Sequence, residues 1–147
     1  MRQVYPAALA TMGFIAMSSV MEGAGMTNFL AVHIAALVGS WFIIASPLIG
    51  AIGGFMSGSN SAANAMFSHF QSIMTEQLHH PTLLYATAQN VSASNMTMAS
   101  PARIALAASI ANRSGHEGQL VRDILPIACA ALVIIMLGTV LLGFFWK

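Results

Sequence analysis

The fold is decided by one stretch of the chain, residues 47–64, which reads PLIGAIGGFMSGSNSAAN. Its first part, Pro47–Ser57, is an apolar arm of 11 residues, or ~17 Å as an α-helix. That length is about half of the ~30 Å hydrocarbon core of a bilayer, and a polar, glycine-containing segment follows at once. The pattern predicts a re-entrant helical hairpin over about residues 47–77, whose tip lies at the membrane midplane. Such a hairpin is tolerated only where protein or a cavity surrounds it.

The returning arm of this hairpin carries a polar stripe. At about 100° per residue, five polar side chains fall within an arc of roughly 80°: Asn60, Asn64, Ser68, Gln71 and Thr75. His69 falls on the opposite face of the same helix. The stripe begins at the glycine tip, which favours a binding surface. The alternative is a helix-packing surface, since membrane helices often pack through small polar residues.

The composition of the whole chain indicates an integral membrane protein. Of 147 residues, 57% are hydrophobic and 6% are charged, whereas a soluble domain has about 25% charged residues. The net charge of +1 excludes a nucleic-acid partner, which requires a basic surface. Apolar runs predict membrane-spanning helices over about residues 4–21, 28–45 and 124–146. A signal peptide is the alternative for the first run, and Ser46-Pro47 should end the second, because the residue before a proline avoids the α-region.

A second interruption lies between residues 82 and 112. His79-His80-Pro81 predicts a turn, and residues 91–99 lack any helical period. Ser100-Pro101 then reads as a helix start, with serine as the N-cap and proline at the first helical position. We expect one helix over about 82–112 that is broken at the midplane. Arg103 lies in the first turn after the break, where a cation opposes the helix dipole. Either Arg103 has an anionic ligand as its partner, or it extends to the membrane interface or pairs with a glutamate elsewhere in the protein.

The two helix starts, near Ser59-Asn60 and Ser100-Pro101, suggest an anion site at mid-membrane depth. Each would offer unpaired backbone N–H groups and a partial positive charge, an arrangement that recurs in transporters with discontinuous helices. The residues expected to bind substrate are Ser59, Asn60, Ser61, Asn64, Asn95, Thr97, Ser100 and Arg103. The sequence has no pattern typical of a metal site, a cofactor site or a catalytic nucleophile. We therefore expect a protein that is not an enzyme, and we expect His33 to be a hydrogen-bonded packing residue rather than a proton carrier.

Several of these segments together resemble the C-terminal part of bacterial L-lactate permeases. The likeness runs in collinear order through Met21–Thr27, Ser46-Pro47, Ser57–Phe67, Met98–Ala105 and Gly115–Arg122. It implies a multi-pass transporter of the bacterial inner membrane that carries L-lactate, or a related 2-hydroxy monocarboxylate such as glycolate, together with protons. It also implies an all-helical fold like one repeat of an inverted-repeat transporter.

The chain departs from the family in three respects, one of which is that Asn60 and Ser61 stand where the family's hairpin commonly has Asp and Thr. Thr97 stands where family members often have a lysine, and Arg103 could supply that charge. The chain is also much shorter than a permease, so we expect a truncated or split product, or half of a two-chain transporter. Its expected partners are the lipid bilayer, a small carboxylate, protons, and the remaining half or a second copy. The alternative functions are a small non-transporting membrane subunit and an inactive permease fragment.

The sidedness of the chain is poorly determined by its charges. The expected topology puts Arg113 and Arg122 on one side of the membrane, and Arg2 and Lys147 on the other. Because each side has two basic residues, the positive-inside rule favours neither orientation. The resemblance favours a cytoplasmic loop between Arg113 and Asp123.

Overall fold

The computed structural model describes residues 4–113 and 115–145, and its regular structure is helical throughout that part of the chain. The elements are, in chain order, α1 (Val4–Gly23), α2 (Met26–Val38), the 3-10 turn η1 (Gly39–Trp41), α3 (Phe42–Ser57), α4 (Asn60–Gln77), α5 (Thr82–Met96), the 3-10 turn η2 (Thr97–Ala99), α6 (Pro101–Ile110) and α7 (Glu117–Phe145). The all-helical fold class is therefore confirmed.

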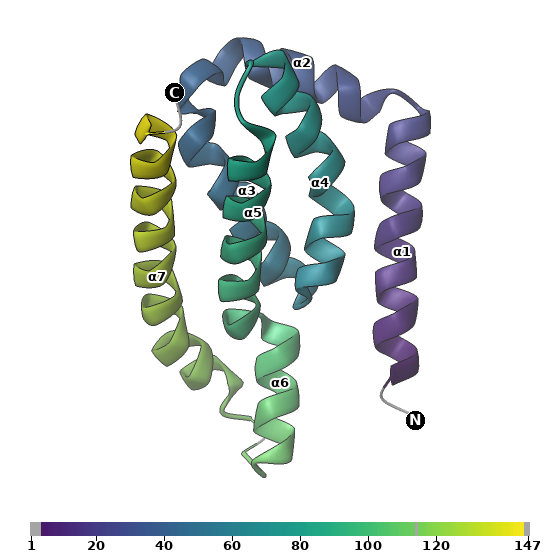
Figure 1. The fold of residues 1–147 in the computed structure, drawn as a ribbon. Coiled ribbons are helices and arrows are strands. Elements are labelled where there is room, and N and C mark those ends of the chain that lie inside the picture. The colour runs from purple at the N-terminus through teal and green to yellow at the C-terminus, as the bar shows by residue number, and fades with distance from the viewer. Residues whose placement is uncertain (1–3, 114, 146–147) are drawn as a thin grey trace.

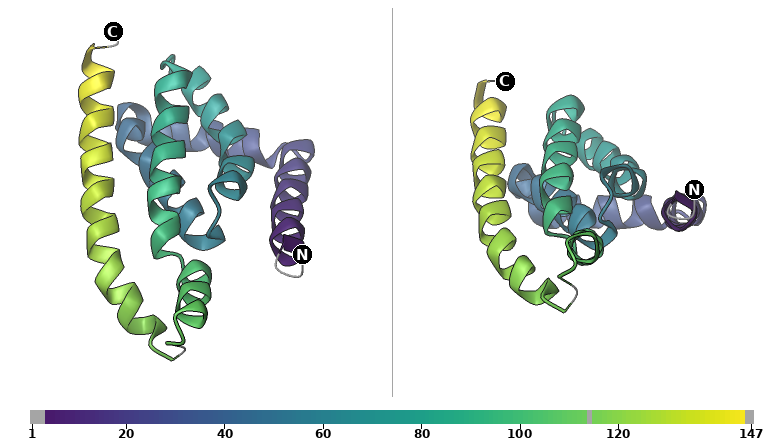
Figure 2. Two further views of the ribbon diagram at one scale, coloured as in Figure 1. Left: turned by 60° about the horizontal axis from the view of Figure 1, so that its bottom comes forward. Right: turned by 90° about the horizontal axis from the view of Figure 1, so that it is seen from below.

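The helices form a bundle around α3, α4 and α5, with α7 on one side and α1 on the other (Figure 1). α1 stands beside the bundle and packs chiefly on α4 and α2, as the two views of Figure 2 also show. α2 runs across the end of the bundle, and α3 runs back from there (Figure 1).

The second expected span, a single helix over 28–45 that ends before Pro47, is wrong in its bounds. The chain turns at Gly39, whose φ of 50° lies in the left-handed region that suits glycine. α3 then begins at Phe42 and continues through Pro47. A proline inside a helix removes one backbone hydrogen bond, but the packing of Pro47 in the core keeps the helix continuous.

The hairpin consists of α3 and α4, joined at Gly58 and Ser59. Gly58 ends α3 in the left-handed conformation, with a φ of 63°, and its N–H donates to the carbonyl of Gly54. α3 has 16 residues, or ~24 Å of helix, which is longer than the ~17 Å predicted for its apolar arm but shorter than a bilayer core.

The interruption between α5 and α6 lies at residues 97–100. The sequence predicted no helix over 91–99, whereas α5 continues to Met96. Small residues in this segment allow α5 to pack closely on α3, so tertiary packing outweighs a weak helical pattern. The prediction of a helix start at Ser100-Pro101 is confirmed, because α6 begins at Pro101 with extended backbone at Ser100.

α3 and α5 run side by side in the same direction, and two glycines allow their close approach. A Cβ atom added to Gly50 would collide with the backbone of Gln89, and one added to Gly54 with the backbone of Ala93. These glycines are four residues apart, the spacing by which membrane helices pack closely. The alignment of α3 with α5 is the same at both glycines. It brings Gly58, at the hairpin tip, beside the start of α6.

Two stretches of the described chain are long and apolar enough to cross a membrane, Met26–Ser57 and Glu117–Phe145. The first is divided between α2 and α3 by the turn at Gly39. α1 has 20 residues, or ~30 Å of helix. The charges expected to flank the outer spans, Arg2 and Lys147, lie outside the described residues, as does residue 146 of the third expected span.

Candidate functional site

The hairpin tip is held by short polar contacts at the N-terminus of α4. Ser59 is the N-cap of this helix, and its Oγ accepts a hydrogen bond from the backbone N–H of Ala62 at 3.3 Å. The Ser57 hydroxyl donates to the carbonyl of Gly53 at 2.7 Å and accepts from the N–H of Ser59 at 3.2 Å. The backbone N–H groups of Asn60 and Ser61 have no helical partner because of their position in the first turn.

The N-terminus of α6 lies directly beside this tip. A Cβ atom added to Gly58 would lie 2.8 Å from Oγ of Ser100 and 3.6 Å from Cβ of Ala102. Ser100 is fully buried, and its hydroxyl has no hydrogen-bond partner among the described residues. It does not cap α6 with its side chain. A buried hydroxyl without a partner is costly, and Ser100 lies behind the wall of the neighbouring cavity rather than on its surface.

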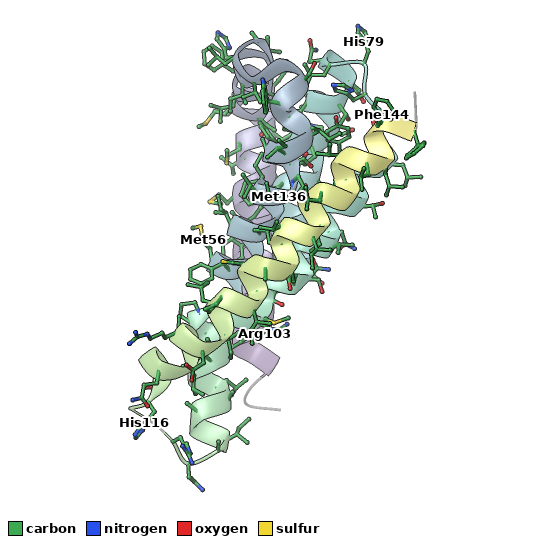
Figure 3. All side chains as sticks on the ribbon, turned by 90° about the vertical axis from the view of Figure 1, so that its left-hand side faces the viewer. Met56, His79, Arg103, His116, Met136 and Phe144 are labelled. Carbon is green, nitrogen blue, oxygen red and sulfur yellow. The ribbon has the colours of Figure 1, made fainter. Side chains whose placement is uncertain are left out.

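Arg103 joins the two helix starts. Its Nε donates to the carbonyl oxygen of Gly58 at 2.7 Å, so the guanidinium caps the C-terminus of α3. A cation is favourable at a helix C-terminus, and this contact explains a charge that opposes the dipole of its own helix. Arg103 is exposed, and Figure 3 shows it at a level between Met56, near the end of α3, and His116, before α7. Its two terminal nitrogens make no hydrogen bond within the described chain.

The hairpin tip and the first turn of α6 border a cavity of about 840 Å³. Ser57, Gly58 and Ser59 line it from the hairpin tip, and Ala102 and Arg103 line it from α6. The remaining wall is apolar, and it comes from Phe14, Ala62, Met98, Ile104, Leu106, Ala107, Ile110 and Ile124. Two helix N-termini and one guanidinium therefore face the same space, in which a small anion could accept several hydrogen bonds.

The polar stripe of α4 faces α5 and α3 rather than the cavity. Asn60 and Asn64 both donate to Oδ1 of Asn90, at 2.8 and 2.6 Å. Asn64 also accepts from Nε2 of Gln89 at 3.2 Å. Further along, Gln71 donates to the carbonyl of Ser46 at 3.2 Å. The stripe thus supports helix packing, which was the alternative interpretation of the sequence. One acceptor, Oδ1 of Asn60, remains buried without a partner among the described residues.

The structure does not bring all of the predicted site residues together. Asn95 points away from the tip, because its amide donates to the carbonyl of Ala128 on α7 at 2.8 Å. The hydroxyl of Thr97 donates to the carbonyl of Ser94 at 2.7 Å, within the break itself. Ser61 is exposed on α4. Ser59, Ser100 and Arg103 are therefore the predicted residues whose side chains meet at the junction.

Other sequence candidates have simple structural roles. Nδ1 of His33 lies 2.8 Å from the carbonyl oxygen of Phe29, one turn earlier in α2. Among the described residues, no group of three or more His, Cys, Asp or Glu side chains could hold a metal ion.

Two further polar contacts had little indication in the sequence. Asn90 and Gln89 complete the amide network, although no sequence pattern pairs them with the stripe on α4. His69 lies 3.5 Å from Glu22, between Nε2 and Oε1. For His69, the sequence indicated only that the side chain lies on the face of α4 opposite the polar stripe.

Comparison with known proteins gives a consistent result. The model of the family described as L-lactate permease matches residues 1–145. The glycolate permease GlcA of Escherichia coli (strain K12) is 32% identical over 108 residues, which cover 74% of this chain and 19% of that protein. The L-lactate permease of Bacillus subtilis (strain 168) is 31% identical over 103 residues, or 70% of this chain and 18% of that protein. No solved structure gives a significant match.

The matched part is a small share of each relative. A shorter match to the L-lactate permease of Streptococcus iniae, 39% identical over 57 residues, covers 12% of that protein. The chain thus spans less than a fifth of the length of these curated relatives.

Proposed function

This chain belongs to the L-lactate permease family, and from that premise we propose that it forms the substrate-binding part of a secondary transporter for L-lactate or glycolate. Members of the family are transporters rather than enzymes. The proposal includes symport with protons and a location in the bacterial inner membrane. It also includes a partner, which is either the remaining part of a permease or a second copy of this chain.

The observation that carries the proposal is the junction of the hairpin tip with the start of α6. A carboxylate that leaves water for the membrane interior needs a cation or several strong donors, because an unpaired buried charge costs several kcal/mol. The N-terminus of α4, the N-terminus of α6 and the free nitrogens of Arg103 could supply them. The hydroxyl of Ser100 could donate a further hydrogen bond.

The proposed membrane arrangement follows from the lengths of the helices. α3 and α4 form a re-entrant hairpin, and α5 and α6 form a broken helix whose interruption meets the hairpin tip. α1 and α7 cross the bilayer. Irregular backbone at such depth requires protein or a cavity around it, and the cavity lined by Gly58, Ser59 and Arg103 is consistent with this condition.

Binding of L-lactate to the purified chain in lipid nanodiscs tests the proposal. The Arg103→Gln variant should bind L-lactate about tenfold more weakly or worse, because a charge-assisted contact contributes on the order of 1.5–3 kcal/mol. Arg113→Gln, which changes an exposed arginine beyond α6, is the matched control and should bind like the parent. Isothermal titration calorimetry measures both affinities.

Ser100→Ala separates binding from folding. This variant removes a buried hydroxyl that has no partner among the described residues, so the stability of the chain should be unchanged or slightly higher. Its affinity for L-lactate should nevertheless fall several-fold. If the chain does not bind L-lactate or glycolate, or if Arg103→Gln and Ser100→Ala both bind like the parent, the carboxylate site is not at this junction. A non-transporting subunit, for which the packing role of the α4 stripe is the supporting observation, would then be favoured.

A further inference from the structure

The cavity at the junction is large for the small acids of the proposed function. Its volume of about 840 Å³ falls in the range of pockets that bury drug-sized ligands, ~300–1,000 Å³. The polar groups of its lining come from the hairpin tip and from Arg103 in the first turn of α6. L-lactate and glycolate, with three and two carbon atoms, would contact this polar end and leave the rest of the cavity unused.

One face of α6 leads away from the polar end. Arg103, Leu106, Ala107 and Ile110 all line the cavity, and their spacing of three and four residues places them in one stripe along the helix. Ile110 lies seven residues after Arg103, or about 10 Å along the axis. The first side chain of this stripe is charged and the other three are apolar, so the lining changes from polar to apolar along α6.

The other walls of the cavity are apolar as well. Phe14 comes from α1, Met98 from η2 and Ile124 from α7. α1 and α6 stand apart in both views of Figure 2, and side chains of both helices line the cavity. Leu106 and Ile110, on α6, are 51% and 74% exposed. A ligand with a hydrocarbon chain could therefore bury apolar surface on them.

We propose that the site takes 2-hydroxy monocarboxylates with a longer apolar chain than lactate, of about six carbon atoms. The inference rests on the proposed function, because it extends the substrate class of the same carboxylate site. The carboxylate would lie at Arg103, and the chain would follow Leu106 and Ala107 along α6. Three further carbon–carbon bonds of about 1.5 Å each lengthen lactate by less than about 5 Å. The extended ligand thus fits within the ~10 Å of the stripe.

The apolar chain should strengthen binding through the hydrophobic effect. Full burial of one methylene group raises affinity about fourfold at 25 °C. Because Leu106 and Ile110 are half exposed or more, we expect partial burial and a gain of about two- to threefold for each methylene. 2-Hydroxyhexanoate has three methylene groups more than lactate, so it should bind roughly tenfold more tightly. Arg103→Gln should weaken both acids by the same factor, since the carboxylate is common to them.

The experiment is calorimetry of L-lactate, 2-hydroxybutyrate and 2-hydroxyhexanoate with the chain in nanodiscs, after subtraction of the heats measured with empty nanodiscs. The readout is the ratio of the dissociation constants of lactate and 2-hydroxyhexanoate. Ala107→Leu fills the cavity beside the stripe, so this ratio should fall from about ten to about two or less. Ala105→Leu is the matched control, because Ala105 is exposed about 200° around the same helix and outside the cavity lining. It should keep the ratio of the parent.

Leu106→Ser is a second variant, which serves as the test if Ala107→Leu does not fold. It removes an exposed part of the apolar wall, and it should lower the ratio at least twofold. Equal affinities of the parent for lactate and 2-hydroxyhexanoate would overturn this inference and leave the carboxylate site intact. A ratio that neither Ala107→Leu nor Leu106→Ser changes would also overturn it, because the chain of the ligand would then lie in lipid. A protein that binds none of the three acids would overturn the proposed function, and this inference with it.

Discussion

Gly54 determines how closely α3 and α5 approach, and its replacement by alanine tests the register that builds the junction. A Cβ atom at this position would lie 2.8 Å from both Cα and the carbonyl carbon of Ala93, and its contact with the carbonyl oxygen would be closer still. Ordinary contacts of this kind measure 3.4–4 Å. The obstacle is backbone, which cannot rotate away as a side chain does.

The magnitude follows from two opposing terms. Relief of the collision with the carbonyl oxygen requires α3 and α5 to separate by more than about 1 Å, and overpacking of this kind costs about 1–3 kcal/mol. The upper end applies here because both partners are helix backbone. Alanine in place of glycine inside a helix returns about 1 kcal/mol. The free energy of unfolding of Gly54→Ala should therefore fall by about 2 kcal/mol.

Gly138→Ala is the matched control for this substitution. Gly138 lies inside α7, and a Cβ atom there would meet nothing within 4 Å. Its replacement should leave stability unchanged or raise it by up to about 1 kcal/mol. Unfolding of the purified chain in mixed micelles by a denaturing detergent measures both variants. A Gly54→Ala chain as stable as Gly138→Ala would refute the close packing of α3 on α5.

Two further predictions concern the membrane topology and the ends of α4 and α6. Ser40, in η1 between α2 and α3, and Gln77, the last residue of α4, are exposed, and the connections of α2 to α3 and of α4 to α5 lie at the same end of the bundle (Figure 1). In a cysteine-free background, cysteines at these two positions should react with an impermeant reagent from one side of the membrane, and a cysteine at Ser109, near the end of α6, should react from the other. Labelling of Ser40 and Gln77 from opposite sides would contradict re-entry. His79→Gly should raise the free energy of unfolding by roughly 1 kcal/mol, because His79, just after the C-cap of α4, has a φ of 54°. The same change at Asn112, where φ is 52°, should gain less, since asparagine tolerates this conformation, and equal effects would argue against backbone strain.

The general architecture could be predicted from the sequence because it depends on local signals. The polar glycine-containing tip after Ser57 predicted a helix end and a new start, and Ser100-Pro101 predicted the start of α6. Both are N-terminal signals that act within one helical turn. The same local rules failed at Ser46-Pro47, where a buried proline is held inside α3, and at residues 91–96, where packing against the glycines of α3 keeps α5 helical.

The site was only partly predictable, because side-chain partners are set by tertiary contacts. The period of α4 grouped Asn60 with Asn64, but it could not show that α5 would cover them through Asn90. Asn95 looked like a site residue because it lies in the segment that was predicted to be non-helical, yet its side chain points toward α7 and its amide donates to the carbonyl of Ala128. The helical period of a sequence predicts on which side of its helix a residue lies. Which helix packs against that side depends on the tertiary fold.

Arg103 illustrates how helix dipoles must be considered together at the junction. α4 and α6 begin there, each with about half a positive charge, and α3 ends there with about half a negative charge. The contact from Arg103 to the carbonyl of Gly58 offsets the negative end of α3. The positive ends of α4 and α6 then face the cavity without opposition from α3. Within α6 alone the arginine is unfavourable, whereas at the three-helix junction it caps α3.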